Sequence, residues 1–228
     1  MFTALIFDFD GLIIDSETPL FDIWAEIYAR HGQQLTLDEW QHALGTQGGF
    51  DPYADLASRA AELVDRASLA EWVRAEHWRL CGGQPLLPGV RARLDEAVEL
   101  GLATAVASSS PSAWVSPWLE RHDLAGRFAA VCTRDDVAQV KPAPDLFLLA
   151  AERLAAVPAA CVVFEDSPNG LRAAHAAGMR AVAVPNALTR DLALPEPHLV
   201  MQSLDELTLA EILHRLAGPH GRQERARP

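Results

Sequence analysis

The sequence predicts an α/β fold with a doubly wound, Rossmann-like parallel-sheet core and an inserted all-helical cap domain. Two observations support this prediction. From about residue 88 onward, short apolar runs typical of buried strands alternate with stretches of helical spacing, as in a parallel sheet with helices on both faces. Between the first apolar run and this alternating region, residues 16–86 show helical spacing and no convincing strand.

The first expected strand covers residues 5–9, a short apolar run that ends in acidic residues. A helix should follow, with Thr18 as its N-cap and Pro19 at the first helical position. This helix is expected to run to about Arg30, because Gly32 is a typical residue just beyond a helix end. Helical spacing continues through the rest of the insert.

The core resumes after residues 88–89. The expected elements are a helix over 90–100, a strand over 102–107, a helix over 112–122, a strand over 129–133, a helix over 144–155, a strand over 161–164, a helix over 168–177, a strand over 181–184 and a helix over 204–216. We therefore expect a catalytic core from residues 1–15 and 87–218, a helical cap over 16–86, and a flexible, arginine-rich tail over 219–228.

The composition favours a soluble globular protein. Half of the 228 residues are hydrophobic, which allows a sizeable core, and the formal net charge of -12 opposes binding to nucleic acid or anionic membranes. The three cysteines form no CxxC pair, which favours a reducing compartment. The N-terminus has no basic start, and no apolar stretch approaches the length of a membrane span. We therefore expect a cytoplasmic protein that binds neither nucleic acid nor membranes.

Ligands of parallel sheets bind at the carboxyl ends of the strands, so the residues that follow each strand are candidates for chemistry. Asp8 and Asp10 end the first strand, and residues two apart on an extended chain point to the same side. Aspartate can act as a nucleophile toward phosphorus, and a second carboxylate can protonate the leaving oxygen and later deprotonate water. A pair of solvated loop acids or a helix cap is the alternative.

Ser108 begins a run of serines after the 102–107 strand. Its hydroxyl and nearby backbone N–H groups could bind phosphoryl oxygens, although ordinary turn chemistry before Pro111 explains the same residues equally well. Lys141 is the only lysine of the chain and lies between a strand and a helix that begins with proline. Its ammonium would act as a point charge on phosphate, and an unspecific surface position is the alternative.

Glu165 and Asp166 follow the 161–164 strand. A first-turn acid favoured by the helix dipole is the alternative for Asp166, but two acids at the end of a buried strand match the pair at Asp8. Mg²⁺ prefers a near-octahedral shell of oxygens, which carboxylates from two strand ends and a substrate phosphate would supply. The sequence therefore predicts a magnesium site beside Asp8.

Together these residues resemble the haloacid dehalogenase superfamily. Its four ordered motifs correspond here to residues 8–12, Ser108, Lys141 and residues 165–166, and the resemblance covers essentially the whole chain. The helical insert and the stretch 164–170 are similar to the subgroup that includes β-phosphoglucomutase and many sugar-phosphate phosphatases.

The resemblance implies a role for each motif. Asp8 would be the nucleophile and a metal ligand, and Asp10 would be the general acid–base and bind the metal through its backbone carbonyl. Ser108 and Lys141 would hold the transferring phosphoryl group, and the acids of the fourth motif would complete the Mg²⁺ site. The implied enzyme is a phosphoric monoester hydrolase that acts on a small phosphorylated metabolite, such as a sugar phosphate, through an aspartyl-phosphate on Asp8.

Other activities of similar proteins are weighed against the same residues. Carbon–halogen cleavage is disfavoured by Asp10, because dehalogenases of this family lack that aspartate. A Schiff-base mechanism is excluded because the cap contains no lysine. A phosphosugar mutase remains an alternative, although β-phosphoglucomutase has a histidine where this chain has Leu20. A phospho-acceptor signalling domain shares the strand-end chemistry, but such domains are shorter and have no helical insert.

Specificity is expected to come from the cap and the strand ends. The candidate substrate-binding residues are Phe9, Gly11, Glu17, Thr46, Gln47, Ser109 and Asn169. Thr46 and Gln47 lie in a glycine-rich loop that suits a close approach to a ligand, and an ordinary interhelical turn is the alternative. A hinge near Asp15 and Leu87 should let the cap move. We expect a monomer or a weak homodimer whose partner is its small phosphate-ester substrate.

Overall fold

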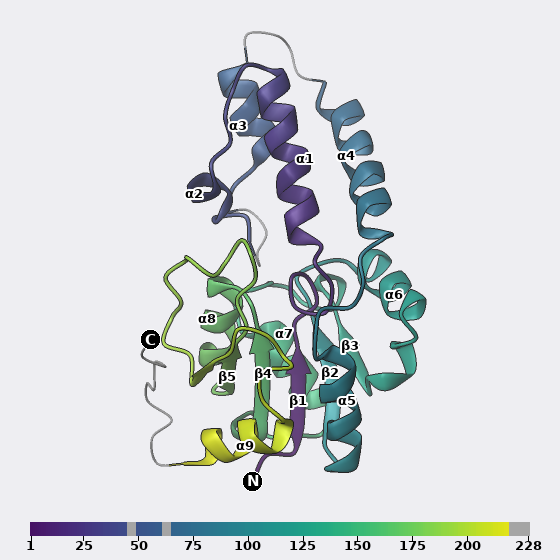
Figure 1. Cartoon of the computed structure of the whole chain (residues 1–228), viewed down its shortest axis with the longest axis vertical. Coiled ribbons are helices and arrows are strands. Elements are labelled where there is room, and N and C mark those ends of the chain that lie inside the picture. Colours follow the sequence, from purple (N-terminus) through teal and green to yellow (C-terminus); the bar gives the residue numbers. More distant parts are fainter. Residues whose placement is uncertain (45–48, 61–64, 219–228) are drawn as a thin grey trace.

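The structure, a computed structural model of the whole chain, describes residues 1–44, 49–60 and 65–218. These residues form a six-stranded sheet of order β3-β2-β1-β4-β5-β6, in which all neighbours are parallel. The strands are β1 (Ala4–Phe7), β2 (Ala103–Ala107), β3 (Ala130–Cys132), β4 (Cys161–Glu165), β5 (Arg180–Ala183) and β6 (Leu199–Val200). The predicted α/β class with a parallel-sheet core is confirmed (Figure 1).

Helices cover both faces of the sheet. They are α5 (Val90–Glu99), α6 (Ser112–Arg121), α7 (Asp145–Arg153), α8 (Pro168–Ala176) and α9 (Leu209–Ala217), with short 3-10 helices η1 (Ala125–Arg127), η2 (Arg134–Asp136) and η3 (Pro158–Ala160). Along β1, Leu5 and Phe7 pack with α5, α6 and α9, whereas Ala4 and Ile6 pack with α7 and α8. This alternation makes an apolar layer on each side of the sheet and holds the strand ends at a common edge.

The remaining described helices stand above the carboxyl end of the sheet (Figure 1). They are α1 (Glu17–Arg30), α2 (Leu37–Trp40), α3 (Pro52–Arg59) and α4 (Arg66–Cys81). Their own apolar core includes the buried side chains of Trp24, Tyr28, Trp40 and Leu56. The inserted helical part of the predicted fold is thus confirmed. The proposed boundaries of core and cap remain a prediction, and the expected tail over 219–228 lies outside the described residues.

Two chain segments join these helices to the core. The Leu87 N–H donates to the Ile13 carbonyl (2.9 Å), and an isolated bridge pairs Ile14 with Leu86. The segment that leaves the core and the segment that returns to it therefore lie side by side, where the sequence predicts a hinge.

The start of α1 differs from the sequence prediction. The helix begins at Glu17, after Ser16 as N-cap, rather than after Thr18. The Asp15 side chain accepts a hydrogen bond from the Thr18 N–H (3.0 Å), so the first turn forms earlier in the chain. As a result Glu17 is the first helical residue and projects from the point where the chain enters the cap.

The C-terminal elements also differ from the prediction. The last helix begins at Leu209 and not near residue 204, because Thr208 and Glu211 form a capping box there. Strand β6 has two residues, too short a run to be predicted from apolar spacing. None of the described helices is long and apolar enough to span a membrane.

Candidate active site

The carboxyl ends of β1, β2 and β4 form the floor of the candidate site. Because β1 lies between β2 and β4, Asp8, Ser108 and Glu165 reach the same edge of the sheet. The Asp8 N–H donates to the Phe164 carbonyl (3.0 Å) and the Ser108 N–H to the Cys132 carbonyl (2.9 Å). The hydrogen-bond ladder thus fixes both residues one position beyond their strands, since β1 ends at Phe7 and not at the predicted residue 9.

Lys141 joins two of these strand ends. Its Nζ lies 2.6 Å from Oδ1 of Asp8 and 2.6 Å from Oε1 of Glu165, and all three side chains are buried. Burial by itself would lower the pKa of Lys141, but the carboxylates of Asp8 and Glu165 raise it above its ordinary value. The single lysine of the chain is therefore a charged group inside the site and not a surface residue.

Asp8, Glu165 and Asp166 form a cluster of buried carboxylates. Each offers an oxygen within 4.8 Å of the others, the one such group among the residues that the structure describes. Burial and the charge of Glu165 raise the pKa of Asp8 to about 7, although Lys141 opposes the shift. Burial and the charges of Glu165 and Asp8 likewise raise the pKa of Asp166 well above its ordinary value. Because one ammonium does not balance three carboxylates, the oxygen-rich cluster fits a hard divalent cation such as Mg²⁺.

The other carboxylate oxygens of Glu165 and Asp166 are held by neighbouring groups. Oε2 of Glu165 accepts hydrogen bonds from the Ser167 N–H (3.1 Å) and hydroxyl (3.0 Å). Gly170 packs so closely that a Cβ there would lie 1.8 Å from Oε1 of Glu165. Oδ2 of Asp166 accepts from Nδ2 of Asn186 (2.7 Å). Both acids are therefore oriented by the start of α8 and by the segment after β5.

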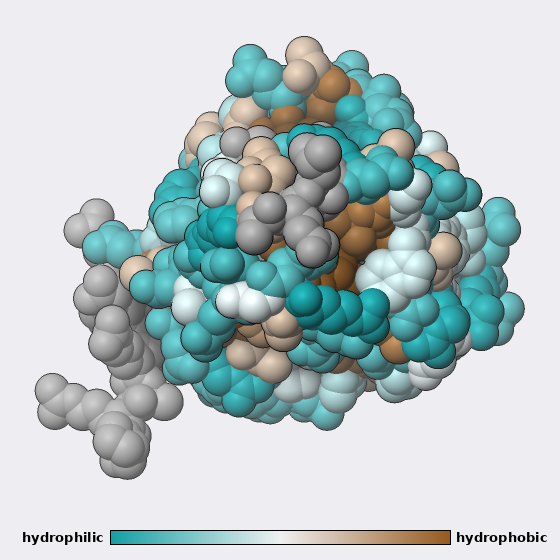
Figure 2. Space-filling view, turned by 90° about the horizontal axis from the view of Figure 1, so that it is seen from above, coloured by the Kyte–Doolittle hydropathy of each residue, from teal (hydrophilic) through white to brown (hydrophobic). Residues whose placement is uncertain are grey.

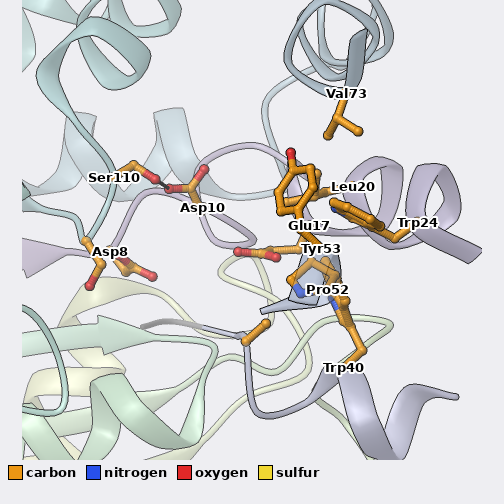
Figure 3. A pocket seen from close by; sticks show the side chains of 12 residues that line it. Asp8, Asp10, Glu17, Leu20, Trp24, Trp40, Pro52, Tyr53, Val73 and Ser110 are labelled. Atoms are coloured by element: carbon orange, nitrogen blue, oxygen red, sulfur yellow. Dashed lines mark hydrogen bonds between the residues drawn. The ribbon is translucent and has the colours of Figure 1, made fainter. Parts of the chain in front are cut away.

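Asp10 accepts hydrogen bonds on both of its carboxylate oxygens. Oδ1 accepts from Oγ of Ser16 (2.6 Å) and from Nε1 of Trp114 (2.8 Å). Oδ2 accepts from Oγ of Ser110 (2.6 Å), a bond drawn in Figure 3, and from Oγ of Ser108 (3.3 Å). A carboxylate held in this way can give or take a proton at a fixed position.

A pocket of about 320 Å³ opens beside Asp8 and Asp10. Its other described lining residues are Glu17, Leu20, Trp24, Trp40, Ala43, Pro52, Tyr53, Val73, Ser109 and Ser110. The aspartates lie on one side of the pocket and Trp24 and Trp40 on the other, with Glu17 between them (Figure 3). Seen from above, an apolar hollow is bordered by hydrophilic surface (Figure 2). The described lining contains no lysine and no arginine.

Glu17 brings a further acid from the cap to this pocket. Burial raises the pKa of Glu17 to about 8, and the charges of Asp10, Asp8 and Asp15 add to the effect. A carboxyl group with this pKa is largely protonated at neutral pH, so it can both donate and accept hydrogen bonds. Of the substrate-binding residues predicted in the cap, Glu17 is the one that the structure places in the pocket lining, since Thr46 and Gln47 lie outside the described residues.

The other predicted substrate-binding residues occupy different positions. Ser109 lines the pocket. The side chain of Phe9 is fully buried in the apolar core, so the phenyl group is not part of the described lining. The Gly11 carbonyl accepts from Nδ2 of Asn186 (3.3 Å), beside Asp166. Nδ2 of Asn169 donates to the Leu44 carbonyl (3.0 Å) and so connects α8 to the cap.

Sequence reasoning does not identify four residues that orient the acids, namely Ser16, Ser110, Trp114 and Asn186. Asn186 follows β5 closely, so the strand-end rule would have identified it if applied to that strand as well. Ser110 stands in the serine run after β2. Trp114 carries no comparable signal, because its contact with Asp10 depends on how α6 packs in three dimensions.

Comparison with known proteins extends the motif analysis. The chain matches the haloacid dehalogenase-like hydrolase family over residues 2–178. It is 41% identical over 216 residues to YhcW of Bacillus subtilis, which has a provisional phosphatase name; the match covers 95% of this chain and 98% of YhcW. It is 34% identical to hexitol phosphatase B of Escherichia coli, with 92% and 96% of the two chains covered.

A solved structure gives a similar result. A variant of CbbY from Rhodobacter sphaeroides, in complex with xylulose-1,5-bisphosphate, superposes with a TM-score of 0.75 at 28% identity and covers 92% of this chain and 98% of its own. The parallel-sheet fold, its strand-end acids and these matches define the chain as an enzyme of the hydrolase class. Within that class it belongs to the haloacid dehalogenase-like hydrolase family, as its four motifs predict.

Proposed function

We propose that this enzyme is a magnesium-dependent phosphatase that hydrolyses a small phosphate monoester through an aspartyl-phosphate on Asp8. The observation that carries the proposal is the arrangement around Asp8. Its carboxylate is ion-paired to the buried Lys141, and Asp10, two residues further along, lines the same pocket. A nucleophile, a fixed cation and an acid–base are thus available to a single phosphoryl group.

The reaction proceeds in two steps. In the first, an oxygen of Asp8 bonds to phosphorus, the bond from phosphorus to the ester oxygen breaks, and Asp10 gives its proton to that oxygen. In the second, Asp10 removes a proton from water, the water oxygen bonds to phosphorus, and phosphate leaves with Asp8 restored. Lys141 and the Ser108 hydroxyl hold the phosphoryl oxygens during both steps.

The carboxylates of Asp8, Glu165 and Asp166, together with the backbone carbonyl of Asp10, would hold the cation. When bound, Mg²⁺ supplies positive charge that neutralises the acid cluster and the phosphoryl oxygens. Two observations support this assignment. The oxygens of the cluster lie close enough together to share one ion. The pKa of Asp8 is raised by burial and by the charge of Glu165, which a bound cation would offset.

The substrate is proposed to be the monophosphate of a sugar or polyol, with the cap over residues 16–86 setting specificity. The pocket offers aromatic faces from Trp24, Trp40 and Tyr53, which suit the C–H faces of such a molecule, and Glu17, which suits its hydroxyls. Among the described residues the lining has no lysine or arginine, which does not favour a second phosphate or a carboxylate. The similarity to hexitol phosphatase B supports the same substrate class.

The decisive experiment is phosphate release from a panel of phosphorylated metabolites, with Mg²⁺ and with EDTA. In the panel, each polyol monophosphate that carries no charge besides its phosphate should be paired with a bisphosphate or carboxylated analogue of the same length. We expect phosphate release that requires Mg²⁺ and is faster from the member of each pair with no second charged group. Interconversion of sugar phosphates in the presence of a bisphosphate primer, without net phosphate release, would overturn the proposal in favour of a mutase.

Asp8→Asn tests the nucleophile directly. The amide cannot form the aspartyl-phosphate, so turnover should fall by at least about 1000-fold. Asp22→Asn, the same substitution at an exposed position of α1, should leave turnover unchanged. Near-normal turnover by Asp8→Asn would rule out the covalent mechanism.

A further inference from the structure

Asp10 is contacted by an aromatic group from α6 that takes part in none of the steps above. The indole Nε1 of Trp114 donates to Oδ1 of Asp10 (2.8 Å), and Oγ of Ser16 donates to the same oxygen (2.6 Å). Both donors are linked to His77 of α4. Nε2 of His77 donates to the Ser16 carbonyl (2.7 Å), and the His77 ring stacks on Trp114 with centroids 4.5 Å apart. A cap residue therefore contacts both groups that hold one oxygen of Asp10.

The indole differs from the serine donors in its freedom to move. A hydroxyl can rotate about its C–O bond and can donate or accept, whereas an indole has one N–H that only donates and whose direction is fixed by the ring. The Trp114 ring is held by the nearly parallel ring of His77, at an interplanar angle of 17°, and by the edges of Trp78 and Trp118, at centroid distances of 4.8 and 5.4 Å. The side chain is almost fully buried. Among the described donors to Asp10, Trp114 is thus the one that cannot reorient.

We propose that Trp114 is a positioning residue for Asp10, and that His77 holds it in place from the cap. The inference rests on the proposed function, in which Asp10 transfers the proton. Trp114 fixes Oδ1, so that the other oxygen, Oδ2, remains beside the hydroxyls of Ser108 and Ser110, of which Ser110 lines the pocket. Because His77 and Trp78 belong to α4, the position of this cap helix determines how firmly the indole is held.

The chemistry of the leaving group distinguishes positioning from general packing. An alkyl phosphate releases a strongly basic alkoxide and needs the proton from Asp10, whereas p-nitrophenyl phosphate releases an acidic phenol and hardly needs it. Trp114→Phe keeps a ring in place and removes the N–H. Its kcat/KM should fall about 10- to 100-fold for an alkyl phosphate, as expected for a misplaced catalytic group, and less than about 3-fold for p-nitrophenyl phosphate.

Trp118→Phe is the matched control. It makes the same change in the same aromatic cluster, and its indole nitrogen has no hydrogen-bond partner among the described residues. Phe at this position keeps a ring against Trp114 and removes no N–H that reaches Asp10, so any fall in kcat/KM should be equal for the two substrates. His77→Phe retains a ring against Trp114 but loses the bond to the Ser16 carbonyl. It should show a smaller effect with the same preference for the acidic leaving group, and it provides the test if Trp114→Phe does not fold.

Asp10→Asn separates the failure of this inference from the failure of the proposed function. If Asp10→Asn depends on the leaving group and neither Trp114→Phe nor His77→Phe does, the positioning role is wrong and the acid–base role of Asp10 stands. The comparison uses kcat/KM, which reports the first step, because Asp10 also activates the water of the second step for both substrates. If kcat/KM of Asp10→Asn falls equally on both substrates, the acid role is wrong and the positioning role falls with it. A leaving-group dependence shared by Asp10→Asn and Trp114→Phe, and absent from Trp118→Phe, supports both.

Discussion

Gly170 lies directly against the Glu165 carboxylate, although it contributes no chemical group to the site. A Cβ at Gly170 would lie 1.8 Å from both the carboxyl carbon and Oε1 of Glu165. Because Oε1 is the oxygen paired with Lys141, the absence of a side chain at residue 170 leaves the space in which this ion pair forms. At the scale of single residues, the position of the Glu165 charge therefore depends on the lack of a side chain at Gly170 as well as on the acid itself.

Gly170→Ala should therefore damage both stability and catalysis. The added methyl group must displace the Glu165 carboxylate, and overpacking of this kind lowers the free energy of unfolding by about 1–3 kcal/mol. Urea unfolding and Mg²⁺-dependent phosphate release would measure the two effects. Gly126→Ala is the control, because nothing lies within 4 Å of the position that a Cβ would take there. It should change the free energy of unfolding by less than about 0.5 kcal/mol. Equal stability of the two variants would contradict the steric argument.

The acids of the site can be predicted from the sequence because each lies at or just after the end of a strand. Asp8, Glu165 and Asp166 come directly after or at the end of short apolar runs, and parallel strands bring their ends to one edge. Lys141 is distinguished by its residue type alone. Trp114 could not be predicted in this way. Its distance to Asp10 depends on how α6 packs against the segment that follows β1, and no local pattern in the sequence encodes that packing.

At the scale of secondary-structure elements, Asn169 connects the first turn of α8 to the cap. Its Nδ2 donates to the Leu44 carbonyl (3.0 Å), and its Oδ1 accepts from Nη1 of Arg172 (2.9 Å). The sequence predicts Asn169 as a substrate-binding residue, whereas the described contacts are with the protein itself. We interpret the hydrogen bond from Asn169 to Leu44 as a tie, that is, a direct link between the core and the cap segment just before the predicted specificity loop with Thr46 and Gln47.

Asn169→Ala should raise KM more than it lowers kcat. One hydrogen bond of this kind contributes about 0.5–1.5 kcal/mol, which corresponds to an increase in KM of about 2- to 10-fold if the tie holds the cap in its binding position. Steady-state kinetics on the best substrate of the panel would measure the split. Arg172→Ala removes the other bond of Asn169 and leaves the tie to Leu44 intact, so its KM should stay unchanged. A loss of kcat alone in Asn169→Ala would contradict this interpretation.

The boundaries of elements are less predictable than their order. The strand–helix alternation of the core follows from the sequence, because buried strands and amphipathic helices have different apolar periods. The predicted start of α1 is wrong because the Asp15 side chain, and not that of Thr18, accepts the first-turn hydrogen bond. The two-residue strand β6 is defined by its pairing with β5, a contact that carries no local signal.

At the scale of the whole molecule, an acidic chain places a concentrated negative charge in its interior. The formal net charge is -12, and the carboxyl groups of Asp8, Glu165 and Asp166 lie within one small buried volume, where their ionised forms repel one another. Asp8 has a pKa of about 7 in the folded protein against an ordinary value of 3.8, so the folded state binds its proton more tightly than the unfolded state does. Folding stability and metal binding should therefore depend on pH together.

The sign of this dependence follows from linkage. The stabilising contribution of protonated Asp8 is fully present below pH 3.8 and is lost as the pH rises through about 7, and Asp166 shifts in the same direction. Metal-free protein should accordingly lose this contribution between those values. A bound cation requires the ionised carboxylates. The rise in Tm caused by Mg²⁺ should therefore be small at about pH 5 and several degrees larger at about pH 8.

Thermal unfolding in MgCl₂, in EDTA and in NaCl of equal ionic strength would measure this difference, with the NaCl samples correcting for screening of the surface charge. Asp166→Asn removes one carboxylate of the cluster and should reduce the gain in Tm at the higher pH. Asp22→Asn, at an exposed position of α1, should preserve it. If Mg²⁺ raised Tm equally at both pH values, or equally in both variants, the acid cluster would not be the magnesium site, since its carboxylates must lose their protons before they can bind the ion.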